Sequence, residues 1–323
     1  MVVSPEGKPA EHRDSNVAMH PRWPRRQKKR VLLRSNGPGP ADKRIGRMKT
    51  ILETLYARYN RPQLVGTDPL HFVYQYHRRA DREIVGLLAA ELAYGRVGHI
   101  RKSLTGLFDR MGDSPFAFVR NFDERKAARL RDFKHRFTTG DDISDLLMLL
   151  KTVLSRYGGI ERFFVRGYNP GDSNITSALS KFCDTLLNTY AKTHDGRVPR
   201  GLSYLLPRTA AGSACKRLNL FLRWMVRNDR VDTGLWKAID KAKLIVPVDV
   251  HMGRLCRMLG LYNRKTVSWS AAVRITESFA KIQPTDPVKY DFALSRIGIL
   301  EKCDGSYRAE CEDCELSEIC FQR

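Results

Sequence analysis

The C-terminal end of the chain concentrates residues that could hold a metal. Four of its seven cysteines fall within residues 303–320, with the spacing C-x7-C-x2-C-x5-C. They are Cys303, Cys311, Cys314 and Cys320. Four thiolates in one short segment can surround either a tetrahedral Zn2+ or a cubane iron–sulfur cluster. The remaining cysteines are isolated, and we expect them to be small buried residues. They are Cys183, Cys215 and Cys256. The spacing predicts a metal site and leaves iron and zinc as alternatives.

A carboxylate stands where a helix is expected to begin. In LIVPVDVHMGRLCRMLGL, residues 244–261, an apolar run ends at Pro247 and a helix is expected from about Val250. Asp249 then occupies the N-cap position, where its side chain can accept backbone N–H groups. Capping is the simplest role for this residue. His251 and Arg254 follow in the same helix, and they either contact phosphate or support the helix.

A lysine opens the preceding expected helix. The stretch GSACKRLNLFLRWMVRND, residues 212–229, begins with a turn and continues with a strongly apolar face. Lys216 falls in the first turn, and Arg217 follows it. A lysine at this place can contact phosphate, remain solvated, or serve as a nucleophile if it is held in a suitable site.

The elements that must position these residues are expected to be helices. Apolar residues recur at helical spacing in eight stretches, and no convincing strand alternation is found, so the predicted fold class is mainly α. The stretches are 48–59, 83–94, 142–156, 174–190, 213–227, 250–259, 268–281 and 287–299. Asp142 is expected to cap the third stretch, and residues 192–212 and the AYGR stretch at 93–103 read as loops.

The charge balance indicates a polyanionic partner. The 323 residues carry 57 Lys and Arg against 35 Asp and Glu, a net charge of +22. Residues 1–47 hold 12 of these cations and 4 of these acids, and they are expected to form a disordered basic arm. An alternative is that translation begins at Met48. The other +14 belongs to the helical region 48–300 and the cysteine segment 301–323, so the charge indicates nucleic acid or an acidic membrane as the partner.

The chain lacks the marks of a membrane or secreted protein. It contains no run of 18 or more apolar residues and no secretory leader. We therefore expect a cytoplasmic, nucleoid-associated monomer without a membrane partner. Clustered cysteines in that compartment more often bind metal than form disulfides.

The C-terminal segment resembles the iron–sulfur loop of the endonuclease III branch of the helix–hairpin–helix DNA glycosylases. That loop has the spacing C-x6-C-x2-C-x5-C, one residue shorter than the spacing found here, and Glu315 stands where proline is common. The approach FALSRIGILEKC, residues 292–303, is similar to the last helix of that family. The resemblance implies a two-lobed helical fold with a structural [4Fe-4S] cluster, with Zn2+ as the alternative.

The same resemblance assigns roles to the carboxylate and the lysine. PVDVH, residues 247–251, and Arg254 are similar to the stretch that carries the essential aspartate, with Val250 in place of threonine. The resemblance implies that Asp249 stabilises the sugar cation formed when a C1′–N bond breaks. Lys216 would be the attacking amine in a bifunctional enzyme, although the hairpin sequence before it is not the usual one.

Further residues are candidates for contact with double-stranded DNA by the same resemblance. Arg217 follows Lys216 in the sequence, and His251 and Arg254 follow Asp249. The loop after the helix at 83–94 supplies Tyr94 and Arg96. Most of the chain also resembles a bacterial family of helical proteins without an assigned role, through DPLHF, AYGR, CKRLNLFLRWMVR and PVDVH.

These resemblances imply a base-excision repair glycosylase that cleaves the N-glycosidic bond of a flipped base. They leave open whether it also has AP-lyase activity. Two alternatives stay open. One is a non-catalytic DNA-binding protein of the same fold. The other is an enzyme that cleaves an N-glycosidic bond in RNA or in nucleotides.

Overall fold

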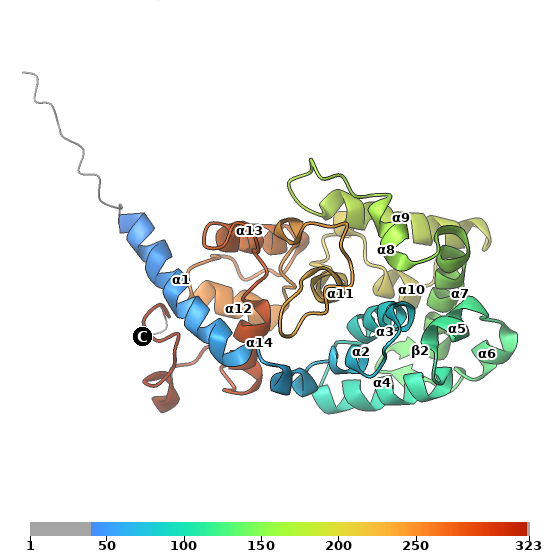
Figure 1. Ribbon diagram of the computed structural model, residues 1–323, viewed down its shortest axis with the longest axis horizontal. Coiled ribbons are helices and arrows are strands. Elements are labelled where there is room, and N and C mark those ends of the chain that lie inside the picture. Colours follow the sequence, from blue (N-terminus) through green and yellow to red (C-terminus); the bar gives the residue numbers. More distant parts are fainter. Residues whose placement is uncertain (1–39, 322–323) are drawn as a thin grey trace, which may run out of the picture. The chain divides into compact units, whose positions relative to one another are not determined.

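Helices carry most of the described chain, which comprises residues 40–321 of this computed structural model (Figure 1). The helices are α1 Pro40–Tyr59, α2 His71–Tyr74, α3 Arg79–Glu91, α4 Val97–Met111, α5 Pro115–Arg120, α6 Glu124–Ala128, α7 Gly140–Tyr157, α8 Ile160–Val165, α9 Thr176–Lys192, α10 Arg200–Leu205, α11 Lys216–Val226, α12 Val250–Met258, α13 Trp269–Ala280 and α14 Asp291–Ile299. Two short strands, β1 Lys134–His135 and β2 Thr138–Thr139, form an antiparallel hairpin. The mainly α class is confirmed.

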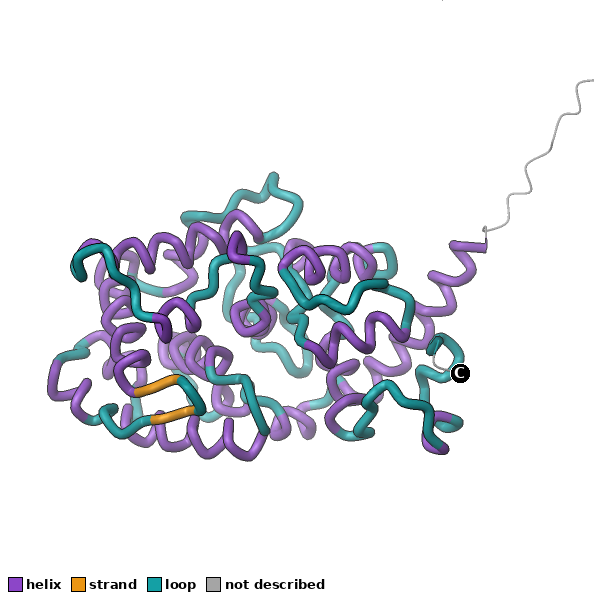
Figure 2. The backbone as a smooth tube through the Cα atoms, turned by 180° about the vertical axis from the view of Figure 1, so that it is seen from behind, coloured by secondary structure: helices purple, strands orange, loops and turns teal. Residues whose placement is uncertain are grey.

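Helix α11 lies between two groups of helices. In Figure 1, α1, α12, α13 and α14 lie on one side of it, and α3 to α10 lie on the other. Helix α11 packs along α3, which also packs against α2 and α5, while α1 and α12 both pack against α14. Figure 2 shows the hairpin, the only strand structure between residues 40 and 321, and β1 packs beside α4.

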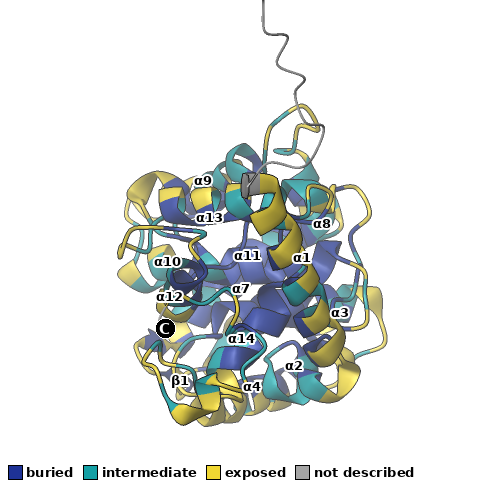
Figure 3. Ribbon diagram, turned by 90° about the vertical axis from the view of Figure 1, so that its left-hand side faces the viewer, coloured by how far each residue is buried: buried dark blue, intermediate teal, exposed yellow. Residues whose placement is uncertain are grey.

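The central helices are buried on all sides. Every residue of α11 from Arg217 to Val226 is buried, and α3 is buried almost throughout. Figure 3 shows both helices in dark blue, whereas α1 carries an exposed outer face. A helix enclosed in this way has no solvent to satisfy its charged side chains, so these must find partners inside the protein.

Two arginines of the α11 segment meet buried carboxylates. Arg223 pairs with Asp291 and, at 3.2 Å, with Asp232. Arg227 contacts Asp232 as well and binds Asp286 at 2.9 Å. Asp232 therefore lies between two guanidinium groups. Burial raises the pKa of Asp232 to about 6, although both guanidinium groups oppose this shift.

A fourth buried carboxylate caps a helix. Glu83 of α3 accepts backbone N–H groups at the start of α8, from Ile160 at 2.9 Å and Glu161 at 3.0 Å. It also accepts Nε1–H of the buried Trp236 at 2.7 Å. Negative charge is favourable at a helix N-terminus, so this contact fixes α8 on α3.

The long helices agree with the sequence expectation, with shifted ends. The helix expected over 142–156 begins at Gly140, because Thr139 is its cap and Asp142 closes a capping box from inside the first turn. The first helix begins at Pro40 rather than Met48, so residues 40–47 of the expected arm are helical. The rest of that arm, residues 1–39, lies outside the described residues.

Several short elements were missed by the sequence analysis. Residues 97–111, partly read as a loop, form α4, and the expected loop 192–212 contains α10. Neither stretch has a strong N-cap: Arg96 and Pro199 precede these helices without a side-chain cap. Their stability comes from packing instead of local signals. Within residues 40–321, no helix has both the length and the apolar character needed to cross a bilayer.

We predict that the buried charges are essential for stability. Arg227→Ala should lower the free energy of unfolding by about 3–5 kcal/mol, because it removes the guanidinium partner of the buried Asp286 and one of the two guanidinium partners of Asp232. Arg208→Ala is the matched control, since the pair of Arg208 with Asp184 is 46% exposed on both sides. The control should cost less than about 1 kcal/mol. Urea denaturation measures both, and equal losses would contradict the prediction.

Candidate functional site

The two residues singled out as candidate catalytic groups lie side by side. Nζ of Lys216 is 3.6 Å from Oδ2 of Asp249, although 33 positions separate them in the chain. Both side chains remain accessible, at 30% and 38% exposure. Each residue stands at the N-terminal end of a helix, Lys216 as the first residue of α11 and Asp249 as the cap of α12. The pair is thus formed by two helix starts that meet at the surface.

The two oxygens of the Asp249 carboxylate make different contacts. Oδ1 accepts the backbone N–H groups of His251 and Met252, both at 2.9 Å. Oδ2 takes no part in the cap and faces Lys216. The N-cap role expected from the sequence is confirmed, and it leaves one oxygen in a fixed position for other chemistry.

Lys216 is held by the chain on both sides. The preceding residue, Cys215, has φ +47°, so the backbone turns through the left-handed region just before the helix starts. The Cys215 side chain is buried, and its Sγ donates to the carbonyl of Pro207 at 3.5 Å. Nζ of Lys216 donates to the carbonyl of Ala93 at 3.3 Å. The amine therefore bridges the loop after α3 and the cap of α12.

The buried charges described above extend to this pair. Burial raises the pKa of Asp291, and Arg223 opposes that shift as its partner. Lys216 also lowers this pKa, whereas Asp249 raises it, so the pair lies within electrostatic range of Asp291. Asp291 therefore connects the pair with the buried Arg223.

Arg217 does not reach the surface. It was expected as a DNA contact, but it is buried, and its guanidinium donates to the carbonyl of Tyr204 and, at 2.9 Å, to that of Glu91. It also stacks over the Tyr204 ring at 3.9 Å. This arginine supports the loop beside Lys216 and leaves no donor at the surface for phosphate, which corrects the expectation.

The other candidate contacts differ in accessibility. Arg96 and His251 are exposed and remain free to meet a ligand. Tyr94 is partly buried, and its hydroxyl donates to the carbonyl of His135 at 2.9 Å. Arg254 donates to the carbonyl of Asp304 in the cysteine segment, so it favours the supporting role left open by the sequence.

An aromatic cluster beside the pair escaped the sequence analysis. Phe137, at the turn of the hairpin, is 55% exposed and stacks on Tyr94 with ring centroids 5.0 Å apart. Tyr204 meets both rings edge-on, at 4.7 Å from Phe137 and 5.4 Å from Tyr94. The three residues are far apart in the chain, and no spacing rule links them. An exposed aromatic ring near the Lys216–Asp249 pair is a surface on which a base can stack.

Glu91 is a buried carboxyl group without a hydrogen bond. Nη1 of Arg217 forms an ion pair with Oε2 at 3.3 Å but donates its hydrogen bond to the Glu91 carbonyl, so neither carboxyl oxygen of Glu91 accepts a hydrogen bond. Burial raises the pKa of Glu91 to about 7, although Arg217 opposes the shift. The group next to the Lys216 helix start therefore titrates near neutral pH.

The four clustered cysteines lie in a loop that packs against α1 and α12. All four are partly buried and free of disulfides. Burial raises the pKa of the Cys314 thiol, and the charges of the other three cysteines raise it further, so the sulfur atoms lie within electrostatic range. Among the described residues, no three Cys, His, Asp or Glu side chains are arranged as a ligand set. The isolated cysteines are buried, as expected.

Contacts to two helices hold the C-terminal end of this loop. Phe321 donates its N–H to the carbonyl of Met258, the last residue of α12, at 2.8 Å. Arg47 of α1 pairs with Glu318 at 2.8 Å, and Leu316 is buried. The loop therefore fastens α12, whose first turn holds Asp249, to α1.

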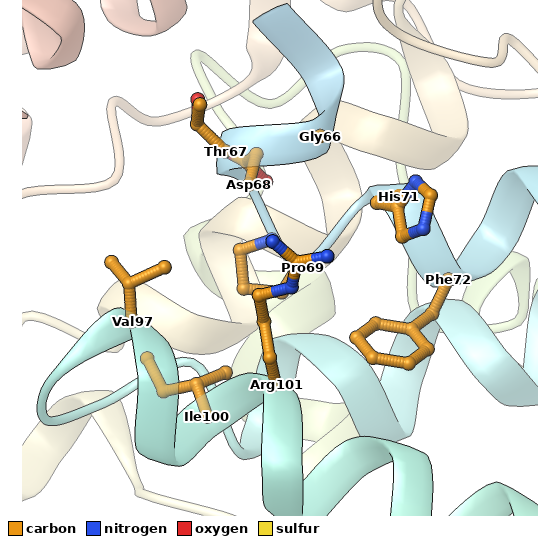
Figure 4. A pocket seen from close by; sticks show the side chains of 9 residues that line it. All are labelled: Gly66, Thr67, Asp68, Pro69, His71, Phe72, Val97, Ile100 and Arg101. Carbon is orange, nitrogen blue, oxygen red and sulfur yellow. The ribbon is translucent and has the colours of Figure 1, made fainter. Parts of the chain in front are cut away.

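A small cavity beside α4 is too narrow for a substrate. It measures about 20 Å3, room for about one water molecule, and lies between residues 66–72 and α4. Figure 4 shows Arg101 beside Pro69 at its centre. Asp68 of its lining binds Arg296 at 3.2 Å, which indicates a structural role.

The family described as "Protein of unknown function (DUF2400)" matches residues 68–300. The chain belongs to this family. The DUF2400 region contains Lys216, Asp249 and the buried charges, and it ends before Cys303. No curated protein and no solved structure matches the chain.

We predict that Glu91 makes stability fall with pH. The folded chain holds this proton more tightly than the unfolded chain, with a pKa of about 7 instead of 4.5. Stability should therefore decrease as the pH rises from about 4.5 to about 7, by about 3 kcal/mol in all. Glu91→Gln should flatten this slope in urea denaturation curves taken across that range.

The control for this prediction is Glu124→Gln, which alters an exposed glutamate of α6. It should keep the slope of the parent protein. If Glu91→Gln also keeps that slope, Glu91 is not the group that titrates.

Proposed function

We propose that the chain is a DNA N-glycosylase of base-excision repair that cleaves the bond between a flipped base and its sugar. The observation that carries this proposal is the Lys216–Asp249 pair, an amine and a carboxylate 3.6 Å apart on two fixed helix starts. A carboxylate whose free oxygen faces a reacting sugar stabilises positive charge at C1′ as the base departs. The geometry of Asp249 suits this role, because the cap fixes its orientation.

The bond changes can be assigned to these two side chains. For hydrolysis, a water oxygen bonds to C1′, its proton passes to Oδ2 of Asp249, and the C1′–N bond breaks with its electrons on the base. For a lyase reaction, Nζ of Lys216 replaces the water as the nucleophile and bonds to C1′ as the base departs. The C1′–O4′ bond then opens, with a proton to O4′, to give the Schiff base. Loss of a C2′ proton breaks the C3′–O bond and releases the 3′ phosphate. The proton lost by Nζ can again pass to Asp249, which is within reach.

Charge and surroundings support a nucleic acid substrate. Residues 48–323 carry +14, which attracts a phosphate backbone. The exposed Phe137 and its partner Tyr94 lie close to the loop whose Ala93 carbonyl accepts Nζ of Lys216, so a base extruded toward the pair would meet aromatic faces. The two groups of helices on either side of α11 are compatible with a two-lobed arrangement that admits the base between them.

The cysteine loop is proposed to hold a [4Fe-4S] cluster, with Zn2+ as the alternative. Its four thiol groups are the donor set of such a cluster, and their charges already act on one another. The cluster would cross-link the loop and so keep α12 in place. Cys303, Cys311, Cys314 and Cys320 would be its ligands.

We predict loss of base release on substitution of the pair. Duplex oligonucleotides should each carry one of uracil, 8-oxoguanine, thymine glycol, an alkylated purine or an abasic site, and be assayed with and without hot alkali. Alkali-dependent strand breaks should fall at least about 100-fold in Asp249→Asn. Breaks without alkali, lost in Lys216→Ala together with borohydride trapping of the enzyme on DNA, would establish the lyase step.

The matched control is Asp123→Asn, which alters another N-cap aspartate, that of α6. It should cleave like the parent protein. Tight duplex binding without cleavage anywhere on the panel would favour the non-catalytic alternative, and release of base from RNA or nucleosides alone would favour the other.

We predict that protein purified without oxygen contains about four iron atoms per chain and little zinc. Cys314→Ser should lower the iron content strongly, because a thiolate ligand is lost, whereas Cys183→Ser should retain it, because that cysteine is buried elsewhere. Elemental analysis and Mössbauer spectroscopy make the measurement. About one zinc per chain would select the alternative metal, and neither metal would contradict the site.

A further inference from the structure

A wide groove beside the candidate site has a basic lining. It lies between α4 and residues 132–136 and encloses about 380 Å3. We call it the α4 groove. Four of its lining side chains are cationic: Lys102, Arg110, Lys134 and Arg136. The imidazoles of His99 and His135 also line it, and burial lowers the pKa of His135, which favours its neutral form. Asp132 is the one acidic side chain in the lining. A concave surface with this imbalance attracts an anion.

The cations of the α4 groove are not neutralised by the protein. Within residues 40–321, Lys102, Lys134 and Arg136 form no ion pair with a carboxylate. Elsewhere the chain pairs its arginines closely, as Arg223 and Arg227 show. Unpaired cations gathered in a hollow repel one another, so an anionic ligand gains from all of them.

A glycine keeps the floor of the groove open. Gly106 stands inside α4, where glycine is less favourable than alanine. No backbone atom demands it, because a Cβ there would approach only Nη1 of Arg110, at 3.2 Å. The same Nη1 donates to the Gly106 carbonyl at 2.6 Å, which holds Arg110 along the floor. The glycine thus preserves space and an arginine position, and it serves no core packing.

The groove joins the candidate site through two successive carbonyls. Nε2 of His135, in the groove lining, lies 3.0 Å from the carbonyl of Tyr94. The carbonyl of the preceding residue, Ala93, accepts Nζ of Lys216 at 3.3 Å. The Arg136 side chain covers Gly95, which has φ +97°. One short backbone segment therefore separates the groove from the amine.

We infer that the α4 groove binds a backbone phosphate of the DNA strand whose sugar reaches the Lys216–Asp249 pair. This inference rests on the proposed function and adds where the strand lies. Lysine, arginine and hydroxyl donors are the usual contacts to phosphate oxygens, and such contacts set the register of a strand. The volume exceeds that of a single water many times over and admits a phosphate with its adjoining sugars.

The test adds a negative charge to the groove floor and leaves every cation in place. Gly106→Glu directs a carboxylate toward Arg110, and glutamate is a better helix former than glycine, so α4 is retained. Thr105→Glu is the matched control, since Thr105 is the neighbouring exposed residue and is absent from the groove lining. Both variants change the net charge equally.

Binding is measured by fluorescence anisotropy on a duplex with a stable abasic-site analogue, over a series of salt concentrations. Gly106→Glu should raise Kd at least about tenfold. It should also lower the slope of log Kd against log salt concentration by about 1, the amount expected for the loss of one phosphate contact. Thr105→Glu should change Kd less than about threefold. Equal effects of the two variants, or no effect of Gly106→Glu, would overturn the inference.

The outcome for the groove is separable from that for the enzyme. Base release at saturating enzyme concentration should proceed in Thr105→Glu at the parent rate, because Thr105 lies outside the groove lining and the variant leaves Lys216 and Asp249 unchanged. If the parent protein releases no base from any substrate, the proposed function fails, and the anisotropy comparison still decides the groove. If the parent protein releases base and Gly106→Glu binds DNA like the parent, only the inference about the groove is overturned.

Discussion

The buried charges at the end of α11 are the constraint on which the rest of the structure depends. Arg223 and Arg227 lie inside the protein because α11 is enclosed on all sides, and they stay there only because carboxylates from later segments reach them. Charges taken out of water are costly unless they are paired. The pairing therefore fixes α14, through Asp291, and the segment at Asp286 against α11. Any shift of these segments would leave a charge alone.

This constraint also decides the position of Lys216 at the other end of α11. The helix cannot slide along α3 without separating its arginines from their carboxylates, so its first residue is fixed as well. Asp249 reaches the same place from α12, which packs on α14. Its orientation comes from the cap, and the cysteine loop holds the last residue of α12. Two helix starts thus meet because both helices are tied to one network.

The charged groups around the Lys216–Asp249 pair differ in whether they have partners inside the protein. Within the part of the chain that the structure describes, the buried arginines form ion pairs, whereas Lys102, Lys134 and Arg136 of the α4 groove form none. Glu91 is buried with its oxygens unsatisfied, and Arg217 supports the loop rather than reaching solvent. Buried groups without partners cost stability, and they gather at functional sites. Their gathering within reach of Lys216 is consistent with a site for an anionic ligand.

The sequence by itself determined the helical class, the N-cap at Asp249 and the burial of the isolated cysteines. Each depends on local signals: apolar spacing, a polar residue before a helix, or the chemistry of one side chain. The tertiary structure alone decided that Lys216 meets Asp249, that Arg217 turns inward, and that Phe137 stacks on Tyr94. Helix α4, which has no side-chain cap, and the groove beside it could not be predicted from the sequence either, because both form by packing between distant segments. Contacts of that kind leave no repeating pattern in the sequence, because they depend on how helices pack and on which buried charges pair.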